Sequence, residues 1–278
     1  MITEKGNASG SAFKFPNTYN AAGGYLSICS GIKGYNVTVT NGAQSGLASM
    51  AYAMSVLRSG QENAMLATGS DENSDTMTEL FGKLGVTSEN VVAPFAGNDG
   101  FVLSDGSASV LIEDEKAAKE RGARIYCHAS GYGMAHSSVK FGTLTGSEAG
   151  LTNAVNNALA DAGMTIDDID AVFGFANGMK AVDDVEIKGL TAVFGDKLAE
   201  KPVVELKEVL GESRAAAATT AAAHAALMFA GKIPSQEAYS IAADGSVSKT
   251  NVEASKLNNV LVVAYGAGGS YTAIVLSK

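Results

Sequence analysis

The side chains with the most evident capacity for chemistry are a serine, two cysteines and three histidines. Ser45 follows the turn NGAQ and stands where a helix is expected to begin, which is a common position for the nucleophile of an acyl-transfer enzyme. The string GAQSG is not the GxSxG of a nucleophile elbow, and no histidine is placed to serve as the base. We therefore expect a capping or packing role for Ser45, with nucleophilic chemistry as the alternative.

The cysteines and histidines show no spacing typical of a metal or redox site. Cys29 and Cys127 lie far apart in the apolar strings LSICSG and RIYCHAS, and His128, His136 and His224 have no ligand spacing. We expect buried structural thiols and no metal. The glycine string GAGGS stands between two expected strands, so it does not indicate a dinucleotide cofactor, and no cofactor is predicted.

Composition narrows the class of protein. The chain has 278 residues, of which 46% are hydrophobic and 18% charged, enough for a sizeable core. A net charge of −9 and a pI near 4.9, with no Lys/Arg cluster, argue against a nucleic-acid partner. No apolar run is long enough to span a membrane and no basic segment leads into one, so we predict a cytoplasmic protein without a membrane partner.

Two segments of the chain repeat one pattern of elements. The alternating string YNVTVT at residues 35–40 predicts a strand, which is followed by the turn NGAQSG and a helix over residues 45–58. The string beginning VVELK predicts a second strand and loop, followed by a helix over residues 214–230 that is almost pure alanine. Helices of small side chains suit burial between two sheets, because their backbones can approach closely. The repeat favours a layered α/β sandwich over a doubly wound sheet.

The remaining elements also alternate between strand and helix, as an α/β sheet architecture requires. Further strands are expected at residues 64–68, 123–129, 170–173, 260–264 and 272–276, and residues 99–113 are expected to form a turn followed by a strand. Helices are expected at residues 114–121 and 149–162, and residues 1–11 have the Gly, Ser and Asn content of a flexible segment.

Residues 99–126 read DGFVLSDGSASVLIEDEKAAKERGARIY. This segment resembles the β-ketoacyl synthase family, because it is similar almost position for position to that family's DGFVxGDGAGxLVLEExExAxxRGAxIY. Asp183 and Glu186 fit the family's DxxE, and YGAGGSYTAIVL fits its closing FGFGGTNGxLxF. The resemblance implies the thiolase-like αβαβα sandwich, here with an incomplete amino-terminal half. We expect two halves, residues 1–145 and 146–278.

The catalytic positions implied by this resemblance hold other residues. The family's TACxSG, with its cysteine nucleophile, reads NGAQSG here and places Ala43 at the nucleophile and Gln44 beside it. The first histidine corresponds to Asn177 in FANGMKAV, and the second to Glu212 in KEVLGESRAAAA, where Lys207 is retained. An alanine cannot form an acyl-enzyme, and an anionic glutamate would repel a developing enolate. The resemblance therefore implies no catalytic residues for condensation.

The loss of all three groups resembles the chain length factors of type II polyketide and polyene systems. That likeness implies a heterodimer with an active ketosynthase, in which the acyl carrier protein docks through the partner and the chain alone is not an enzyme. Ala267, in place of the family's gating Phe, implies an open passage unless Tyr265 or Tyr271 fills it.

Two alternatives stay open. Lys207, Glu212 and Asn177 could form an acid–base site for dehydration or cyclisation of a carrier-bound chain, or simply a structural ion pair. The chain could also be one fragment of a split synthase-like protein, since the family's first strands and helices are missing and we expect another polypeptide to cover the exposed edge.

Overall fold

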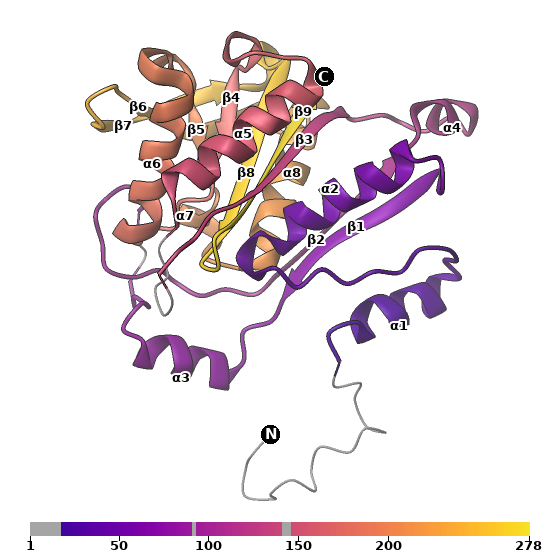
Figure 1. Ribbon diagram of the computed structural model, residues 1–278, viewed down its shortest axis with the longest axis horizontal. Helices are drawn as coiled ribbons and strands as arrows, with labels where there is room; N and C mark the ends of the chain where they lie inside the picture. The colour runs from indigo at the N-terminus through magenta and orange to yellow at the C-terminus, as the bar shows by residue number, and fades with distance from the viewer. Residues whose placement is uncertain (1–17, 91–92, 141–145) are drawn as a thin grey trace, which may run out of the picture. The chain divides into compact units, whose positions relative to one another are not determined.

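The computed structural model describes residues 18–90, 93–140 and 146–278 (Figure 1), so the expected flexible segment at residues 1–11 lies outside the described residues. The chain divides after Thr40 into two compact units, each of which is described by itself. In the first unit, α1 spans Ala21–Ser30 and ends at Gly31, which takes the left-handed conformation with φ 66°. None of the ten residues of α1 is buried, and Cys29 is exposed, so the prediction of a buried thiol there is wrong.

Residues 35–40 do not form the predicted strand. The alternation YNVTVT gives these residues strand propensity, but a strand also needs a second backbone to bond with. No described residue forms a ladder with this segment, which leaves it without regular secondary structure. The segment contacts α1 through one side chain: Asn36 Nδ2 donates to Gly23 O at 3.1 Å and to Ser27 Oγ at 3.2 Å.

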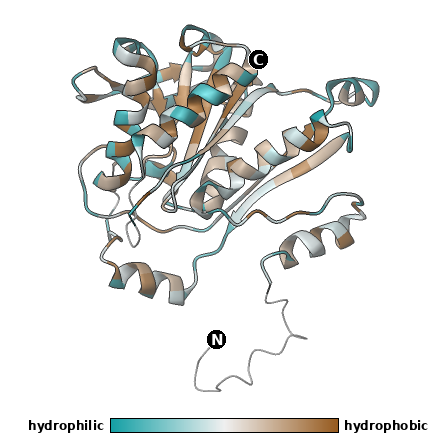
Figure 2. Ribbon diagram, in the orientation of Figure 1, coloured by the Kyte–Doolittle hydropathy of each residue, from teal (hydrophilic) through white to brown (hydrophobic). Residues whose placement is uncertain are grey.

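The second unit is organised around a seven-stranded mixed sheet in the order β3-β9-β8-β4-β5-β6-β7. Its central strand β4 is parallel to β8 and β5, and the other neighbours are antiparallel. Strands β8 and β9 are buried almost throughout, which explains their continuous apolar sequences (Figure 2). The strand bounds are β3 His128–His136, β4 Ala171–Phe173, β5 Val203–Val204, β6 Ser235–Ile241, β7 Val247–Glu253, β8 Asn259–Gly266 and β9 Ser270–Ser277.

A second sheet consists of two antiparallel strands, β1 Ala64–Asp71 and β2 Gly106–Glu113. Their register runs without interruption from the pair Ala64 and Glu113 to the pair Asp71 and Gly106. The strand predicted at residues 64–68 is therefore confirmed and is longer than expected, and the strand predicted within residues 99–113 is confirmed as β2. The strand predicted to start at residue 123 begins only at His128, because residues 123–127 have no ladder partner among the described residues.

The two small-residue helices, α2 Ser45–Arg58 and α8 Ala215–Phe229, lie between the sheets. A Cβ atom on Gly46 would lie 2.2 Å from the Ala215 carbonyl oxygen, and one on Gly69 would lie 2.4 Å from the same atom. Larger side chains at these two glycines would separate α8 from α2 and β1. Both predicted helices are confirmed, although Tyr52 on α2 stays 37% exposed.

The other helices cover the outer face of the large sheet or connect the strands. Helix α5 Glu148–Ala162 packs on β3 so closely that a Cβ on Gly133 would lie 2.1 Å from Ala154 O, and α6 packs beside α5. The predicted layered α/β sandwich is confirmed. The remaining helical bounds are α3 Asp75–Lys83, α4 Glu115–Glu120, α6 Lys180–Phe194, α7 Lys207–Leu210, η2 Gly42–Gln44, η3 Ile166–Asp168, η4 Gly195–Glu200 and η5 Ala254–Lys256.

Candidate functional site

The turn before α2 is closed by its own hydroxyl group. Ser45 Oγ donates to Gly42 O at 2.6 Å and accepts from Asn41 N at 2.7 Å, and the residue is 8% exposed. Gly42 has φ 72°, a left-handed conformation that suits glycine. Both bonds hold the hydroxyl in the turn, an arrangement that serves structure better than nucleophilic attack.

Gln44, next to Ala43, is fully buried and binds the closing strand. Thr272 Oγ1 donates to Gln44 Oε1, while Gln44 Nε2 has no partner among the described residues. The loop after β8 touches the same turn, since a Cβ on Gly42 would lie 3.8 Å from the Cα of Gly266. The turn that carries Ala43 and the glycine loop after β8 therefore meet at one end of α2.

Ala267 in that loop is exposed, and neither nearby tyrosine is free to cover it. Tyr265 is buried and donates through its hydroxyl to Val182 O at 2.6 Å. Tyr271 is also buried, and its hydroxyl accepts from the Ser147 backbone N–H. Both side chains are thus held beneath the loop.

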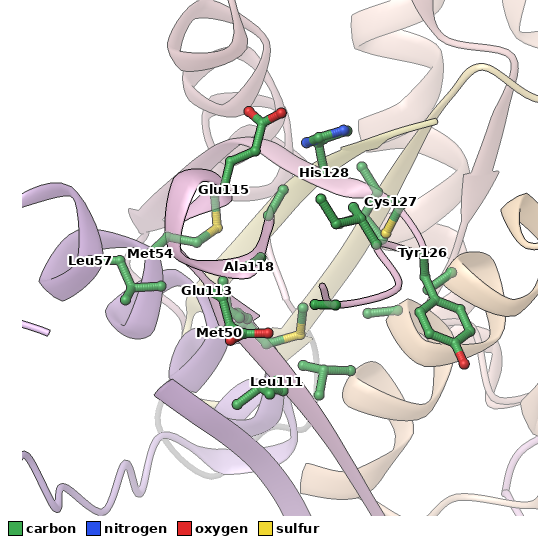
Figure 3. Close-up of a pocket in the computed structure, with 18 of the residues that line it drawn as sticks. Met50, Met54, Leu57, Leu111, Glu113, Glu115, Ala118, Tyr126, Cys127 and His128 are labelled. Atoms are coloured by element: carbon green, nitrogen blue, oxygen red, sulfur yellow. The ribbon is translucent and has the colours of Figure 1, made fainter. Parts of the chain in front are cut away.

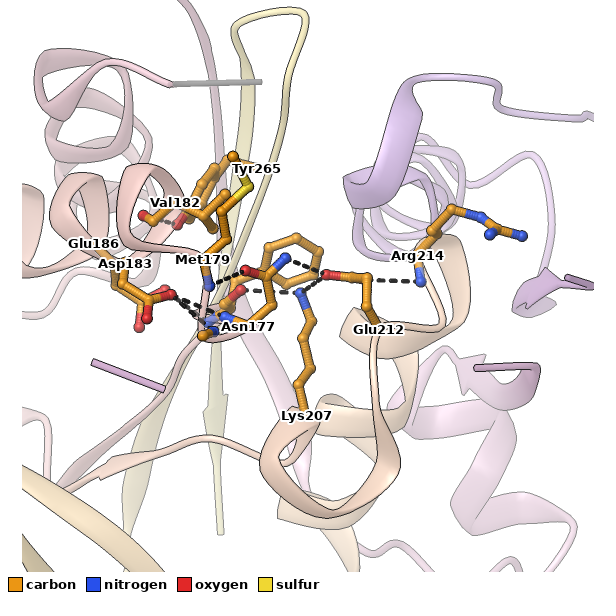
Figure 4. A network of polar contacts seen from close by, with 11 residues as sticks. Asn177, Met179, Val182, Asp183, Glu186, Lys207, Glu212, Arg214 and Tyr265 are labelled. Carbon is orange, nitrogen blue, oxygen red and sulfur yellow. Dashed lines mark hydrogen bonds and ion pairs between the residues drawn. The ribbon is translucent and has the colours of Figure 1, made fainter. Parts of the chain in front are cut away.

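Three of the predicted site residues form one buried polar network (Figure 4). Glu212 Oε2 accepts from Asn177 Nδ2 at 2.9 Å and from Lys207 Nζ at 2.7 Å. Lys207 Nζ also donates to Phe175 O at 2.9 Å and lies 3.1 Å from the centroid of the Phe175 ring. The other carboxylate oxygen, Glu212 Oε1, accepts from Arg214 N at 2.8 Å. Every polar atom of this ion pair's carboxylate is thereby bonded.

Strand direction explains why these residues meet. Asn177 follows β4, Lys207 follows β5 and the glycine loop follows β8. These three strands run in the same direction, because β4 is parallel to both β5 and β8. Their carboxyl ends therefore share one edge, which is where ligands commonly bind in α/β sheets. Glu212 reaches the same edge from the segment that begins α8, beside Arg214, whose φ of 48° is unusual for a residue with a side chain.

Three more acidic side chains border the network. Asp183 accepts from three backbone N–H groups, those of Phe95 at 2.6 Å, Asn177 at 3.0 Å and Gly178 at 3.2 Å. Burial raises the pKa of Asp183 to about 6 despite these bonds. In the sequence, only the DxxE pattern indicates Asp183 and Glu186.

Glu205 is a site residue that sequence reasoning missed. It lies directly after β5, two positions before Lys207, and is 4% exposed. Burial raises its pKa well above the ordinary value, and the negative charge of Glu186 adds to the shift. A charged residue within the otherwise apolar string VVEL was the available signal.

Figure 3 shows a pocket that is lined by none of the residues of this network. It has a volume of about 880 Å³ and is lined by side chains from α2, β2, α4, residues 121–129 and α8, including Met50, Met54 and Cys127. None of Ala43, Asn177, Lys207 or Glu212 lines it. Burial raises the pKa of the Cys127 thiol to about 11, which keeps it protonated and unreactive at neutral pH.

Within the described residues no group of three or more His, Cys, Asp or Glu side chains is arranged to hold a metal ion. No helix in the described part of the chain has the length and apolar character needed to cross a membrane.

Two protein-family models match the chain. Residues 1–118 match the β-ketoacyl synthase N-terminal domain and residues 126–239 match the β-ketoacyl synthase C-terminal domain. The chain belongs to the β-ketoacyl synthase family, as the sequence resemblance predicted.

Individual relatives agree with this assignment. The 3-oxoacyl-[acyl-carrier-protein] synthase 2 of Vibrio cholerae is 30% identical over 204 residues, which are 70% of this chain and 49% of that protein. A putative polyketide β-ketoacyl synthase 2 of Streptomyces halstedii is 29% identical over 276 residues, 94% of this chain and 64% of that protein. The chain thus spans about half the length of the first of these relatives.

Solved structures share the thiolase-like fold. The ishigamide ketosynthase/chain length factor superimposes with a TM-score of 0.83 at 24% identity, over 94% of this chain and 65% of that one. A type II polyketide synthase acyl-carrier protein in complex with its ketosynthase gives a TM-score of 0.84 at 21% identity, over 94% and 67% of the two chains. At these identities the similarity establishes the fold.

Proposed function

We propose that this chain is a non-condensing member of its family that acts as a chain length factor-like partner of an active ketosynthase in polyketide, polyene or fatty-acid biosynthesis. One observation carries the proposal. The positions that match the family's two catalytic histidines, Asn177 and Glu212, are hydrogen bonded to each other at 2.9 Å, and Ala43 stands at the nucleophile position.

The chemistry of that pair opposes condensation. A ketosynthase site needs donors directed at a developing enolate, but Glu212 presents a carboxylate whose oxygens already accept bonds from Asn177, Lys207 and Arg214. Each charge of the buried Lys207–Glu212 pair is compensated by the other, so we expect the two side chains to stay paired rather than to act on a substrate. These features support a role in shape and assembly.

The proposed partner is an active ketosynthase, with the acyl carrier protein docking on that partner. Support comes from residues 36–40, which have strand propensity but no regular secondary structure. Val37 in this segment is 49% exposed. Pairing with the same segment of a ketosynthase would supply the second backbone. The expected halves at residues 1–145 and 146–278 and the cytoplasmic location stay predictions.

The experiment is co-expression with the ketosynthase and acyl carrier protein of the same gene neighbourhood, followed by size exclusion with light scattering. A one-to-one complex with the ketosynthase is expected. A homo-oligomer that does not bind the ketosynthase would contradict the proposal.

An acid–base enzyme is the second candidate, favoured by the buried Lys207–Glu212 pair at the strand edge. Turnover of a carrier-bound acyl chain by this protein alone, abolished in Lys207→Ala, would establish it. A split synthase-like protein is the third candidate, and co-purification with a short α/β polypeptide would establish that.

A further inference from the structure

Two buried carboxyl groups, those of Glu186 and Glu205, lie next to the Asn177 network and have no counterion of their own. Glu186 on α6 is 0% exposed and Glu205 after β5 is 4% exposed. Three of their four oxygens, Glu186 Oε1 and both Glu205 oxygens, have no hydrogen-bond partner among the described residues. The fourth, Glu186 Oε2, accepts from Phe175 N at 2.7 Å. Buried oxygens without partners are rare in folded proteins and need an explanation.

The unpartnered oxygens lie close together across Gly174. A Cβ atom on Gly174 would lie 1.9 Å from Glu205 Oε1 and 2.2 Å from Glu186 Oε1, so these two oxygens are within about 4 Å of each other. Two ionised carboxylates at this separation in a dry interior repel strongly, and such pairs commonly hold one proton between them.

The surrounding charges do not relieve this repulsion. Lys207 attracts Glu205 but directs its ammonium group to Glu212 and to Phe175 O. The other titratable groups that act on the pair are an acid, Asp183 on α6, and a neutral phenol, Tyr265 on β8. Glu212 before α8 also acts on Tyr265 and is acidic. No described cation is hydrogen bonded to either carboxyl group.

We infer that Glu205 and Glu186 form a carboxylic acid–carboxylate pair, in which Glu205 carries a proton at neutral pH and donates it to Glu186 Oε1. Glu186 is the anion of the pair, because its other oxygen accepts a backbone N–H group. The shared proton gives both facing oxygens a partner. The pKa of Glu205, which burial and then the charge of Glu186 raise well above the ordinary value, agrees with this arrangement.

The pair is connected to the polar network through one residue. The N–H of Phe175 donates to Glu186, and its carbonyl accepts from Lys207. Ionisation of Glu205 at high pH would put two negative charges on either side of Gly174 and push apart the segments that hold Phe175. Protonation of the pair therefore holds Asn177 and Lys207 in place, and ionisation of Glu205 at high pH releases them. This holds whether or not the chain is a chain length factor.

Infrared spectroscopy of the whole chain at pH 7 tests this inference. The wild-type protein should show the carbonyl band of a buried protonated carboxylic acid, shifted by deuterium exchange. Glu205→Gln should lose that band, whereas the control Glu200→Gln, at an exposed glutamate, should retain it. A wild-type spectrum without the band, or a band unchanged in Glu205→Gln, would overturn the inference.

The melting temperature of the wild-type protein, measured as a function of pH, gives a second test. Since the pKa of Glu205 is raised in the folded state, its stabilisation is fully present below its ordinary pKa of 4.5 and is lost as pH rises toward the folded value. Glu205→Gln should reduce this loss of melting temperature. In Glu186→Gln, which removes the anion, the acid band should titrate at lower pH. An unshifted band would exclude the pairing.

Discussion

Asn177 and Glu212, 35 residues apart in the sequence, are joined by a hydrogen bond of 2.9 Å between Nδ2 and Oε2. Asn177 holds its own loop in place as well, because its Oδ1 accepts from Met179 N at 3.1 Å. The amide oxygen of Asn177 thus holds the loop after β4, and the amide nitrogen donates to the Glu212 carboxylate before α8. This bond connects two segments of the sheet edge, at the two positions where the sequence resemblance predicts the family's histidines.

The Lys207–Glu212 pair should be a major source of stability. Lys207→Met and Glu212→Gln should each lower the free energy of unfolding by about 3–5 kcal/mol, because each leaves a buried charge without its partner. The double variant should lose less than the sum of the two. Urea unfolding monitored by circular dichroism measures all three.

The matched control is Lys197→Met, which breaks the exposed Lys197–Asp167 pair and should cost about 0–1 kcal/mol. Additive losses in the Lys207 and Glu212 variants would show that the two side chains do not interact.

The close contact between α2 and α8 should be sensitive to a single methyl group. Gly46→Ala would put a Cβ 2.2 Å from Ala215 O, so the helices must separate and the protein should lose about 1–3 kcal/mol or more. Gly24→Ala, inside α1 with nothing within 4 Å, should instead be neutral or stabilising by about 0.5–1 kcal/mol. Melting temperatures of both variants provide the comparison, and equal effects would contradict the packing described.

Introducing a thiol at Ala43, the position that the sequence resemblance predicts for the nucleophile, should not produce condensation. Ala43→Cys places the sulfur near the amino terminus of α2, where the helix dipole favours the thiolate, so acylation by an acyl thioester is expected. Condensation should still fail, because Asn177 and Glu212 do not supply the family's donors. Mass spectrometry in a Cys29→Ser background separates the two steps, and a condensed product from Ala43→Cys would refute the assignment.

Asp183 should titrate near pH 6. Burial raises its pKa from an ordinary 3.8 to about 6, so its contribution to stability is present below about pH 4 and is lost as pH rises through 6. Carbon-13 NMR of the carboxyl groups, with the signal assigned through Asp183→Asn, should give that midpoint. A midpoint at or below 3.8 would mean that the three backbone donors outweigh burial.

The sequence predicted the helices and strands correctly where the local pattern of residue types matches their burial in the structure. Helices α2 and α8 were predicted within one residue, because long runs of small side chains are typical of buried helices. Strands β8 and β9 were predicted within two residues, because both are continuously apolar. The strand predicted at residues 35–40 was wrong because a strand depends on a second backbone, which local alternation does not report.

The site was predictable only in part. The family resemblance located Asn177, Lys207 and Glu212, and the structure brings them together. It gave no indication of Glu205, whose significance depends on the position of Glu186, 19 residues earlier, across Gly174. Through-space proximity of this kind cannot be read from spacing along the chain.

The most direct test of the non-condensing role is a reconstituted condensation assay with purified ketosynthase, acyl carrier protein and this chain, supplied singly and together. This chain alone with the carrier protein should release carbon dioxide and condensed product at no more than the background rate. Together with the ketosynthase it should form a one-to-one complex whose product length differs from that of the ketosynthase alone. Condensation by this chain without the ketosynthase, or products that do not depend on its presence, would contradict the proposed function.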